Sequence, residues 1–347
     1  MSGYRGYNNY RGRTSKGKTL LAVVLVLIIL ASIGFMILQK YVVYDGAGTP
    51  QLMLPGRETE KAVLPEEDEE ELNLTIQEAK KEAPLKGVLL PVPTDREIWS
   101  LSNRQAEEVL GEDHTPMAIT MKDSKGTVHF DSAVAVEGSV RFFMDDSNVV
   151  LDAALTHPVY SIARLSCFRD SKAANQDVEG MGLKNTGGFI FYDGNNTQWL
   201  DPAKEGARKY LCDMAVELAE LGFDEILLTD VSYPTEGKLD KIDYGDTVKA
   251  RNLQTFLEEM RAALAPYEVG LSLELSEATL VEGSDNAAGI ITADLVPLVD
   301  RLYVATAAEN AEELRTVVMR LDEDVEFVPI LPWDSELPEE GGFLLQR

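Results

Sequence analysis

Cysteine and histidine are both scarce in this chain. Its 347 residues include two cysteines, Cys167 and Cys212, and three histidines that show neither HxxxH nor HExxH spacing. Zinc enzymes draw their ligands mainly from these side chains, so the sequence predicts no metal site and no cofactor. In an exported chain the two could form a disulfide, but both lie in apolar patterns far apart in the chain, which predicts two buried thiols instead.

Motifs for nucleotide and acyl-transfer chemistry are missing as well. The chain has no P-loop and no GxSxG nucleophile elbow. Its glycine-rich stretch at 179–188 does not directly follow a predicted strand, as a phosphate-binding turn would. Nucleotide-dependent and serine-hydrolase chemistry are therefore not expected.

Basic residues are few outside the N-terminal segment. The chain has 32 Lys and Arg against 59 Asp and Glu, and residues 1–40 hold six of the bases and no acid. The rest of the chain therefore carries a net charge of −33. Such a charge repels nucleic acid and anionic lipid, so the sequence predicts no nucleic-acid partner and favours neutral or cationic ones.

One long hydrophobic run stands near the N-terminus. Leu20–Leu38 contains 19 residues without a charge, five basic residues precede it, and a polar Gln-Lys-Tyr segment follows. This length matches the hydrocarbon core of a bilayer and exceeds the apolar region of a cleaved signal peptide. The pattern predicts a cytoplasmic basic tail at 1–18 and a single-pass transmembrane anchor in the cell membrane at 19–40.

The segment after this run is acidic and poor in aromatic residues. It carries the sequence "PEEDEEELN" and several prolines. High charge of one sign prevents a packed core, so residues 41–85 are predicted to be an acidic extracytoplasmic linker.

Strands alternate with amphipathic helices from residue 86 onward. Apolar strand patterns recur near 87, 117, 159, 225, 269, 301, 325 and 342, and Asp201-Pro202 predicts the start of a helix that ends at Gly222. Seven or eight such units predict a (β/α)₈ TIM barrel over 86–347, with a doubly wound open sheet as the alternative.

Polar and aromatic residues follow several predicted strands, where barrel enzymes carry their chemistry. A pair of carboxyl groups there can act on a glycosidic bond, one as the acid and the other as the base or nucleophile. The predicted catalytic residues are Asp230, Glu274 and Asp170. The predicted substrate-binding residues are Trp199, Arg169, Lys122, Asp123 and Trp333.

Each of these residues also has a structural interpretation. Asp123, in "KDSKG", fits a turn residue, and Asp230 fits either a turn or a functional carboxylate. Trp199 fits core packing as well as sugar stacking. Glu274 lies inside an apolar strand pattern, where an unpaired carboxylate would be costly.

The chain resembles a family of glycosyl hydrolase domains found in bacterial and archaeal proteins. The resemblance rests on "SIARLSCFRD" (161–170) and "WLDPAKEGARKYLCDMAVELAELGFDEILLTDVSYPTEGK" (199–238), with weaker support from "KDSKGTVHF" and "APYEVGLSLELS". It extends over about 86–347 and implies an α-amylase-like TIM barrel that acts on polysaccharide.

Several polar positions depart from the family's pattern. The family's strand-four acid falls at Thr229, with Asp230 one place later, its arginine falls at Ser232, and its second-strand aspartate falls at Thr120. The fifth-strand aspartate is Glu274. Neighbouring strand residues point to opposite faces, so Asp230 is expected to face away unless a bulge redirects it.

Two functions remain open from the sequence. The first is a membrane-anchored, extracytoplasmic glycoside hydrolase acting on cell-surface polysaccharide. The second is a degenerate, catalytically inactive member that binds a glycan or a cell-wall partner, which the departures favour.

Overall fold

The computed structural model describes residues 42–44, 50–52, 84–90, 110, 116–141, 160–338 and 341–346. The chain divides into two compact units, residues 1–77 and 78–347. In the first unit, β1 (Val42–Tyr44) and β2 (Pro50–Leu52) form an antiparallel pair. The predicted anchor at 19–40 lies outside the described residues. Among the described residues, no helix has both the length and the apolar character to span a bilayer.

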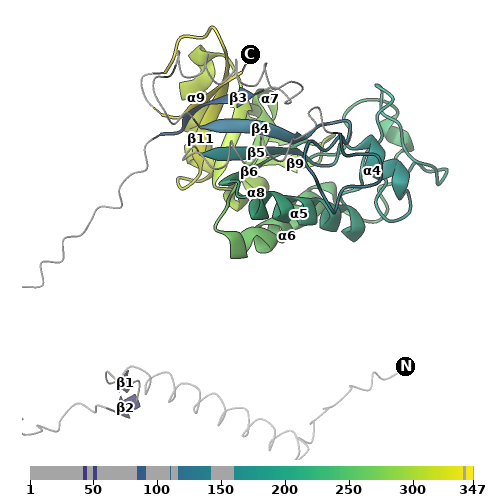
Figure 1. The fold of residues 1–347 in the computed structure, drawn as a ribbon, viewed down its shortest axis with the longest axis horizontal. Coiled ribbons are helices and arrows are strands. Elements are labelled where there is room, and N and C mark those ends of the chain that lie inside the picture. Colours follow the sequence, from purple (N-terminus) through teal and green to yellow (C-terminus); the bar gives the residue numbers. More distant parts are fainter. Residues whose placement is uncertain are drawn as a thin grey trace, which may run out of the picture. The chain divides into compact units, whose positions relative to one another are not determined.

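The second unit is built on a closed barrel of eight parallel strands (Figure 1). They are β3 (Lys86–Leu90), β4 (Met117–Lys122), β5 (Ser161–Ser166), β6 (Glu225–Thr229), β7 (Gly270–Ser276), β10 (Arg301–Ala305), β11 (Glu326–Pro332) and β12 (Phe343–Gln346). β12 pairs with β3 and so closes the ring. The predicted (β/α)₈ barrel is confirmed, and the open-sheet alternative is wrong.

Helices and short turns connect the strands. The helices within the described residues include α4 (Ser171–Gln176), α5 (Glu205–Glu220), α6 (Lys249–Leu264), α7 (Glu277–Glu282), α8 (Thr292–Leu295) and α9 (Ala311–Leu321). The 3₁₀ turns are η1 (Leu239–Lys241), η2 (Ala265–Tyr267), η3 (Val296–Leu298) and η4 (Ala308–Asn310), and β8 (Ser284–Asp285) pairs with β9 (Ile290–Ile291). Figure 1 shows α4 and its neighbouring loops beyond the ends toward which β4 and β5 point.

Alternation along the strands produces two hydrophobic layers. Alternate strand residues such as Ala118, Ile162, Leu227 and Val328 form one buried cluster inside the barrel. Their neighbours along the strands join the larger cluster that the helices cover. All eight barrel strands and both clusters lie within residues 85–346, so residues 78–347 have the elements of an independently folding domain.

The helix predicted from Asp201 begins later than expected. α5 starts at Glu205, while the Asp201 carboxylate accepts a hydrogen bond from Ala203 N (3.0 Å) in a turn that precedes it. The helix ends at Glu220, and Gly222 follows the cap residue with a φ of 99°, the left-handed conformation that glycine tolerates. Asp201-Pro202 therefore has the sequence of a helix N-cap but forms a turn before the helix, and Lys204 is the N-cap residue of α5.

Both cysteines are buried free thiols, as predicted. Burial raises the pKa of Cys212 to about 12 and raises that of Cys167 further. Both thiols are therefore protonated at neutral pH and unreactive.

A buried polar network lies at the amino ends of the barrel strands. The carboxylate of Glu225, the first residue of β6, is fully buried and lies 2.6 Å from Nη1 of Arg301, the first residue of β10. It also accepts hydrogen bonds from the hydroxyls of Tyr160, Ser272 and Tyr303. Barrel enzymes use the opposite end for chemistry, so this network stabilises the fold.

Candidate functional site

Two charged side chains meet inside the barrel toward its carboxyl end. Arg164 of β5 donates from Nε and Nη2 to the two carboxylate oxygens of Glu274 on β7, at 2.9 and 3.0 Å. Arg164 shares the inward parity of Ile162, and the two side chains are 26% and 21% exposed. The pair is therefore bidentate and still open to solvent.

The Asp230 carboxylate also turns toward the barrel interior. Asp230 follows β6 and has a φ of 51°, a left-handed conformation that is uncommon outside glycine. Its Oδ2 accepts a hydrogen bond from Ser166 Oγ at 2.6 Å, and Ser166 has the same inward parity as Arg164. The left-handed residue breaks the strand alternation, so Asp230 is redirected toward the interior, which is the exception that the sequence left open.

These groups define the barrel mouth, which we take as Arg164, Ser166, Asp230 and Glu274. β6 and β7 are neighbours with Leu228 opposite Leu273, so Asp230 and Glu274 stand near the same ends of adjacent strands. The structure thus brings two of the three predicted catalytic acids to one opening. Among the described residues, no three His, Cys, Asp or Glu side chains form a group that could hold a metal ion.

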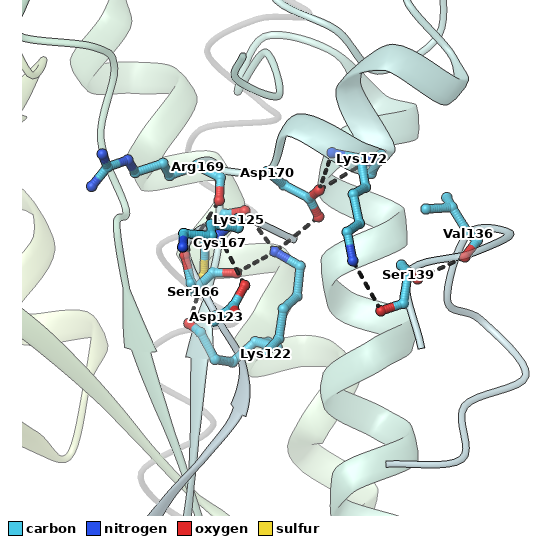
Figure 2. A network of polar contacts seen from close by, with 12 residues as sticks. Lys122, Asp123, Lys125, Val136, Ser139, Ser166, Cys167, Arg169, Asp170 and Lys172 are labelled. Carbon is cyan, nitrogen blue, oxygen red and sulfur yellow. Dashed lines mark hydrogen bonds and ion pairs between the residues drawn. The ribbon is translucent and has the colours of Figure 1, made fainter. Parts of the chain in front are cut away.

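The third acid lies elsewhere, in a buried ion pair. Asp170 Oδ2 is 2.9 Å from Lys122 Nζ, and both side chains are 0% exposed (Figure 2). Asp170 Oδ1 caps α4 by accepting from Lys172 N and Ala173 N, and Lys122 Nζ donates to Ser166 O at 2.6 Å. This pair ties the ends of β4 and β5 to α4 and offers no surface to a substrate.

Asp123 and Arg169 lie beside this pair with other partners. Asp123 Oδ1 accepts from Lys125 N and Thr127 N, both at 2.9 Å, so the residue orders a turn. Burial raises its pKa, but hydrogen bonds from His129 and from these backbone groups outweigh burial and hold the pKa well below its usual range. The Arg169 side chain points away from the Lys122–Asp170 pair in Figure 2.

The two tryptophans differ in how they lie. Trp199 is 7% exposed and donates from Nε1 to Asp193 Oδ2 at 3.0 Å, which leaves little of its ring for a sugar. The Arg169 guanidinium carbon lies 6.0 Å from the centre of that ring. Trp333 directly follows β11 and packs half-buried against the core. Their predicted role in substrate binding stays a prediction.

Arg164 and Ser166 are mouth residues that sequence reasoning missed. An arginine in the run "SIARLSCF" needs a partner for the same reason that Glu274 does, because an unpaired buried charge is costly. Pairing the two charges found within apolar strands would have identified this contact.

The sequence matches the family described as "Putative glycosyl hydrolase domain" over residues 109–304, more than half of the chain. The chain belongs to this family. The matched segment contains all four mouth residues, and the match confirms the resemblance seen in the sequence. No curated protein matches the chain.

Solved structures that this chain resembles include glycoside hydrolase domains. The PgaB (BpsB) glycoside hydrolase domain from Bordetella bronchiseptica is 15% identical, with 72% of this chain and 85% of that one covered and a TM-score of 0.52. A hypothetical protein from Ruminiclostridium thermocellum is 25% identical, covering 54% of this chain and 96% of that one, with a TM-score of 0.47. The PelA domain from Pseudomonas aeruginosa is 13% identical, covering 74% and 86%, with a TM-score of 0.39.

The left-handed backbone at Asp230 predicts a difference between two variants that both remove its carboxylate. Asp230→Gly is expected to be more stable than Asp230→Ala by about 1 kcal/mol, because glycine adopts a positive φ without the steric cost that alanine meets. Urea denaturation of residues 78–347 measures the difference. Equal midpoints would show that the residue relaxes out of this conformation.

Proposed function

We propose that the barrel domain binds a polysaccharide at the barrel mouth, on the outer side of a membrane to which the N-terminal segment anchors the chain. The observation that carries the proposal is the bidentate Arg164–Glu274 pair, open to solvent, with the redirected carboxylate of Asp230 on the neighbouring strand.

The chemistry of the mouth suits hydroxyl-rich ligands. The carboxylate oxygens of Glu274 and Asp230 accept hydrogen bonds from sugar hydroxyls, and the remaining guanidinium N–H groups of Arg164 donate to them. Because the hydrogen bonds within the mouth already fix these side chains, binding costs little ordering entropy. The net charge of −33 beyond residue 40 favours a neutral or cationic chain over an anionic one.

Binding without turnover agrees best with the contacts of the acids. A general acid must carry a proton toward the leaving oxygen. Both oxygens of Glu274 accept from the Arg164 guanidinium, and Asp230 Oδ2 accepts from the Ser166 hydroxyl. In this arrangement both carboxyl groups serve as acceptors.

Hydrolysis is the second candidate, because two carboxyl groups share the ends of adjacent strands. Retaining and inverting enzymes both require such a pair across the bond to be cleaved. In that case Glu274 and Asp230 are the catalytic pair, and Arg164 must release Glu274 when substrate enters.

The sequence supports the membrane location. Leu20–Leu38 has the length of a bilayer span, and the basic residues precede it. The acidic segment at 41–85 would then hold the barrel domain away from the surface. Protease protection of the intact chain in sealed vesicles tests this orientation.

A polysaccharide panel tests the function of the mouth. Residues 78–347 are run in native gels containing β-1,4-glucan, β-1,4-mannan, xylan, chitin or its de-N-acetylated form, and reducing ends are assayed in parallel. We expect at least one polysaccharide to retard the protein, and Glu274→Gln to weaken this retardation about tenfold or more because it breaks the bidentate pair.

The matched control is Glu259→Gln, which breaks a bidentate pair with Arg208 between helices α6 and α5. If the unchanged protein generates new reducing ends and Glu274→Gln does not, hydrolysis is the function and binding without turnover is wrong. Retardation by none of the polysaccharides, without new reducing ends, would contradict both functions.

A further inference from the structure

Two aromatic side chains project into solvent from the connection between β5 and α5. Phe189 is 74% exposed and Tyr192 is 48% exposed, and they are the aromatic members of the exposed large hydrophobic side chains among the described residues. The connection begins at the carboxyl end of the strand that carries Arg164 and Ser166, so it leaves the barrel at the same end as the mouth. We call Phe189 and Tyr192 the rim aromatics.

The backbone that carries Phe189 is held rigidly. Asn185 Oδ1 accepts hydrogen bonds from Gly187 N (2.9 Å) and Phe189 N (3.2 Å), which close the hairpin tip. Thr186 N donates to Lys241 O at 2.8 Å, which fastens the hairpin to the connection after β6. A Cβ on Gly187 would lie 3.5 Å from Cδ2 of the Phe189 ring, so the ring rests against this glycine.

Tyr192 precedes a second fixed turn. Asp193 Oδ1 accepts from Asn195 N and Thr197 N, both at 2.8 Å, and its Oδ2 holds the indole of Trp199. Gly194 packs against Gly237 so closely that a Cβ on Gly237 would lie 2.8 Å from Gly194 N. The buried Trp199 thus fixes this turn through its hydrogen bond to Asp193.

Exposed rings on rigid loops indicate a binding surface. Burying a phenylalanine side chain is worth about 1.5–3 kcal/mol, so leaving it exposed on an ordered hairpin forgoes stabilisation. A ligand that covers the rings recovers this burial without having to order the loops.

The surroundings of the rings indicate what kind of ligand covers them. The rings end a Phe-Ile-Phe-Tyr run whose inner members, Ile190 and Phe191, are half-buried and buried, and "KNTGG" and "DGNN" lie before and after it. Phe189 and Tyr192 are therefore the large apolar side chains that this connection exposes. Protein interfaces place aromatic residues in an apolar core. Exposed rings of this kind suit a sugar, which has an apolar C–H face and hydroxyl edges, and the Asn195–Glu236 pair offers amide and carboxylate groups in the loop that follows Tyr192.

We propose that the rim aromatics form a stacking subsite for a neutral polysaccharide that extends from the barrel mouth along the β5–α5 connection. The inference rests on the proposed function, because the same chain would occupy both places. Three residues of backbone place the Cα atoms of Phe189 and Tyr192 at most about 10 Å apart, a span that successive sugars of one chain can cover.

The test compares polymer with short oligosaccharide. Residues 78–347 carrying Phe189→Ser and Tyr192→Ser together are measured against a polysaccharide that retards the unchanged protein and against its disaccharide. We expect the dissociation constant for the polymer to rise about tenfold or more and that for the disaccharide, which fills the mouth alone, to stay within twofold. The matched control is Val248→Ser, which replaces a 68% exposed side chain after β6.

The outcomes separate the subsite from the mouth. Unchanged polymer affinity in the double variant, with affinity lost in Glu274→Gln, overturns the subsite and leaves the proposed function standing. Affinity lost in the double variant but kept in Glu274→Gln moves binding away from the mouth and overturns the proposed function. A dimer of the unchanged protein in sedimentation that the double variant abolishes assigns the rings to self-association and also overturns the subsite.

Discussion

Arg301→Met is expected to lower the free energy of unfolding of the barrel domain by about 3–5 kcal/mol, because it leaves the Glu225 carboxylate buried without a counter-charge. Glu225 is 0% exposed, and Arg301 Nη1 is its cationic partner at 2.6 Å. The three hydroxyls that also contact Glu225 supply hydrogen bonds but no charge. Urea denaturation of residues 78–347 at neutral pH measures the loss.

Two further variants identify the cause of this loss. Arg301 also contacts Glu326, whose side chain is 35% exposed, so Glu326→Gln removes the outer half of the network and is expected to cost under about 1 kcal/mol. The double variant Arg301→Met with Glu225→Gln removes both buried charges and is expected to recover part of the loss. A double variant less stable than Arg301→Met alone would refute the uncompensated charge as the cause.

Lys122→Met is expected to have an effect of similar size, again about 3–5 kcal/mol, because the Asp170 carboxylate is then buried alone. Lys122 Nζ also holds Ser166 O, so the loss extends to the strand that carries the mouth. Thermal or urea unfolding measures it, with the exposed neighbour Lys125→Met as the matched control.

A second substitution, at Asp170, distinguishes a structural role of Lys122 from a role in ligand binding. Lys122→Met with Asp170→Asn removes the stranded charge, and asparagine can still cap α4, so stability is expected to return in part. If Lys122 instead contacts substrate, Lys122→Met would abolish polysaccharide binding while unfolding stays unchanged. That result would contradict the structural role assigned to the pair.

Much of the fold was predictable because its signals are local. Apolar runs near each of the eight strands were visible in the sequence, and a glycine at 222 correctly marked the end of α5. The start of α5 was not predictable from Asp201-Pro202, because the same dipeptide also begins a turn and only the backbone geometry distinguishes the two.

The site was predictable only in part because its geometry is not local. Glu274 stood out as a charge in an apolar strand, but its partner Arg164 lies 110 residues away and becomes identifiable only when the barrel closes. The alternation rule misplaced Asp230, since one left-handed residue cancels it. Asp170 follows a barrel strand as a site residue would, but its buried carboxylate caps α4 and pairs with Lys122.

The pairing of β12 with β3 has a consequence for synthesis. Phe343 lies opposite Lys86, so the final seam joins strands from near the two ends of the domain. Until the last few residues of that domain leave the ribosome, a nascent chain carries two unpaired strand edges that could recruit foreign strands. The ring therefore completes only after its whole sequence is available, and a stop codon just before Phe343 would yield an aggregation-prone product rather than a slightly shortened barrel.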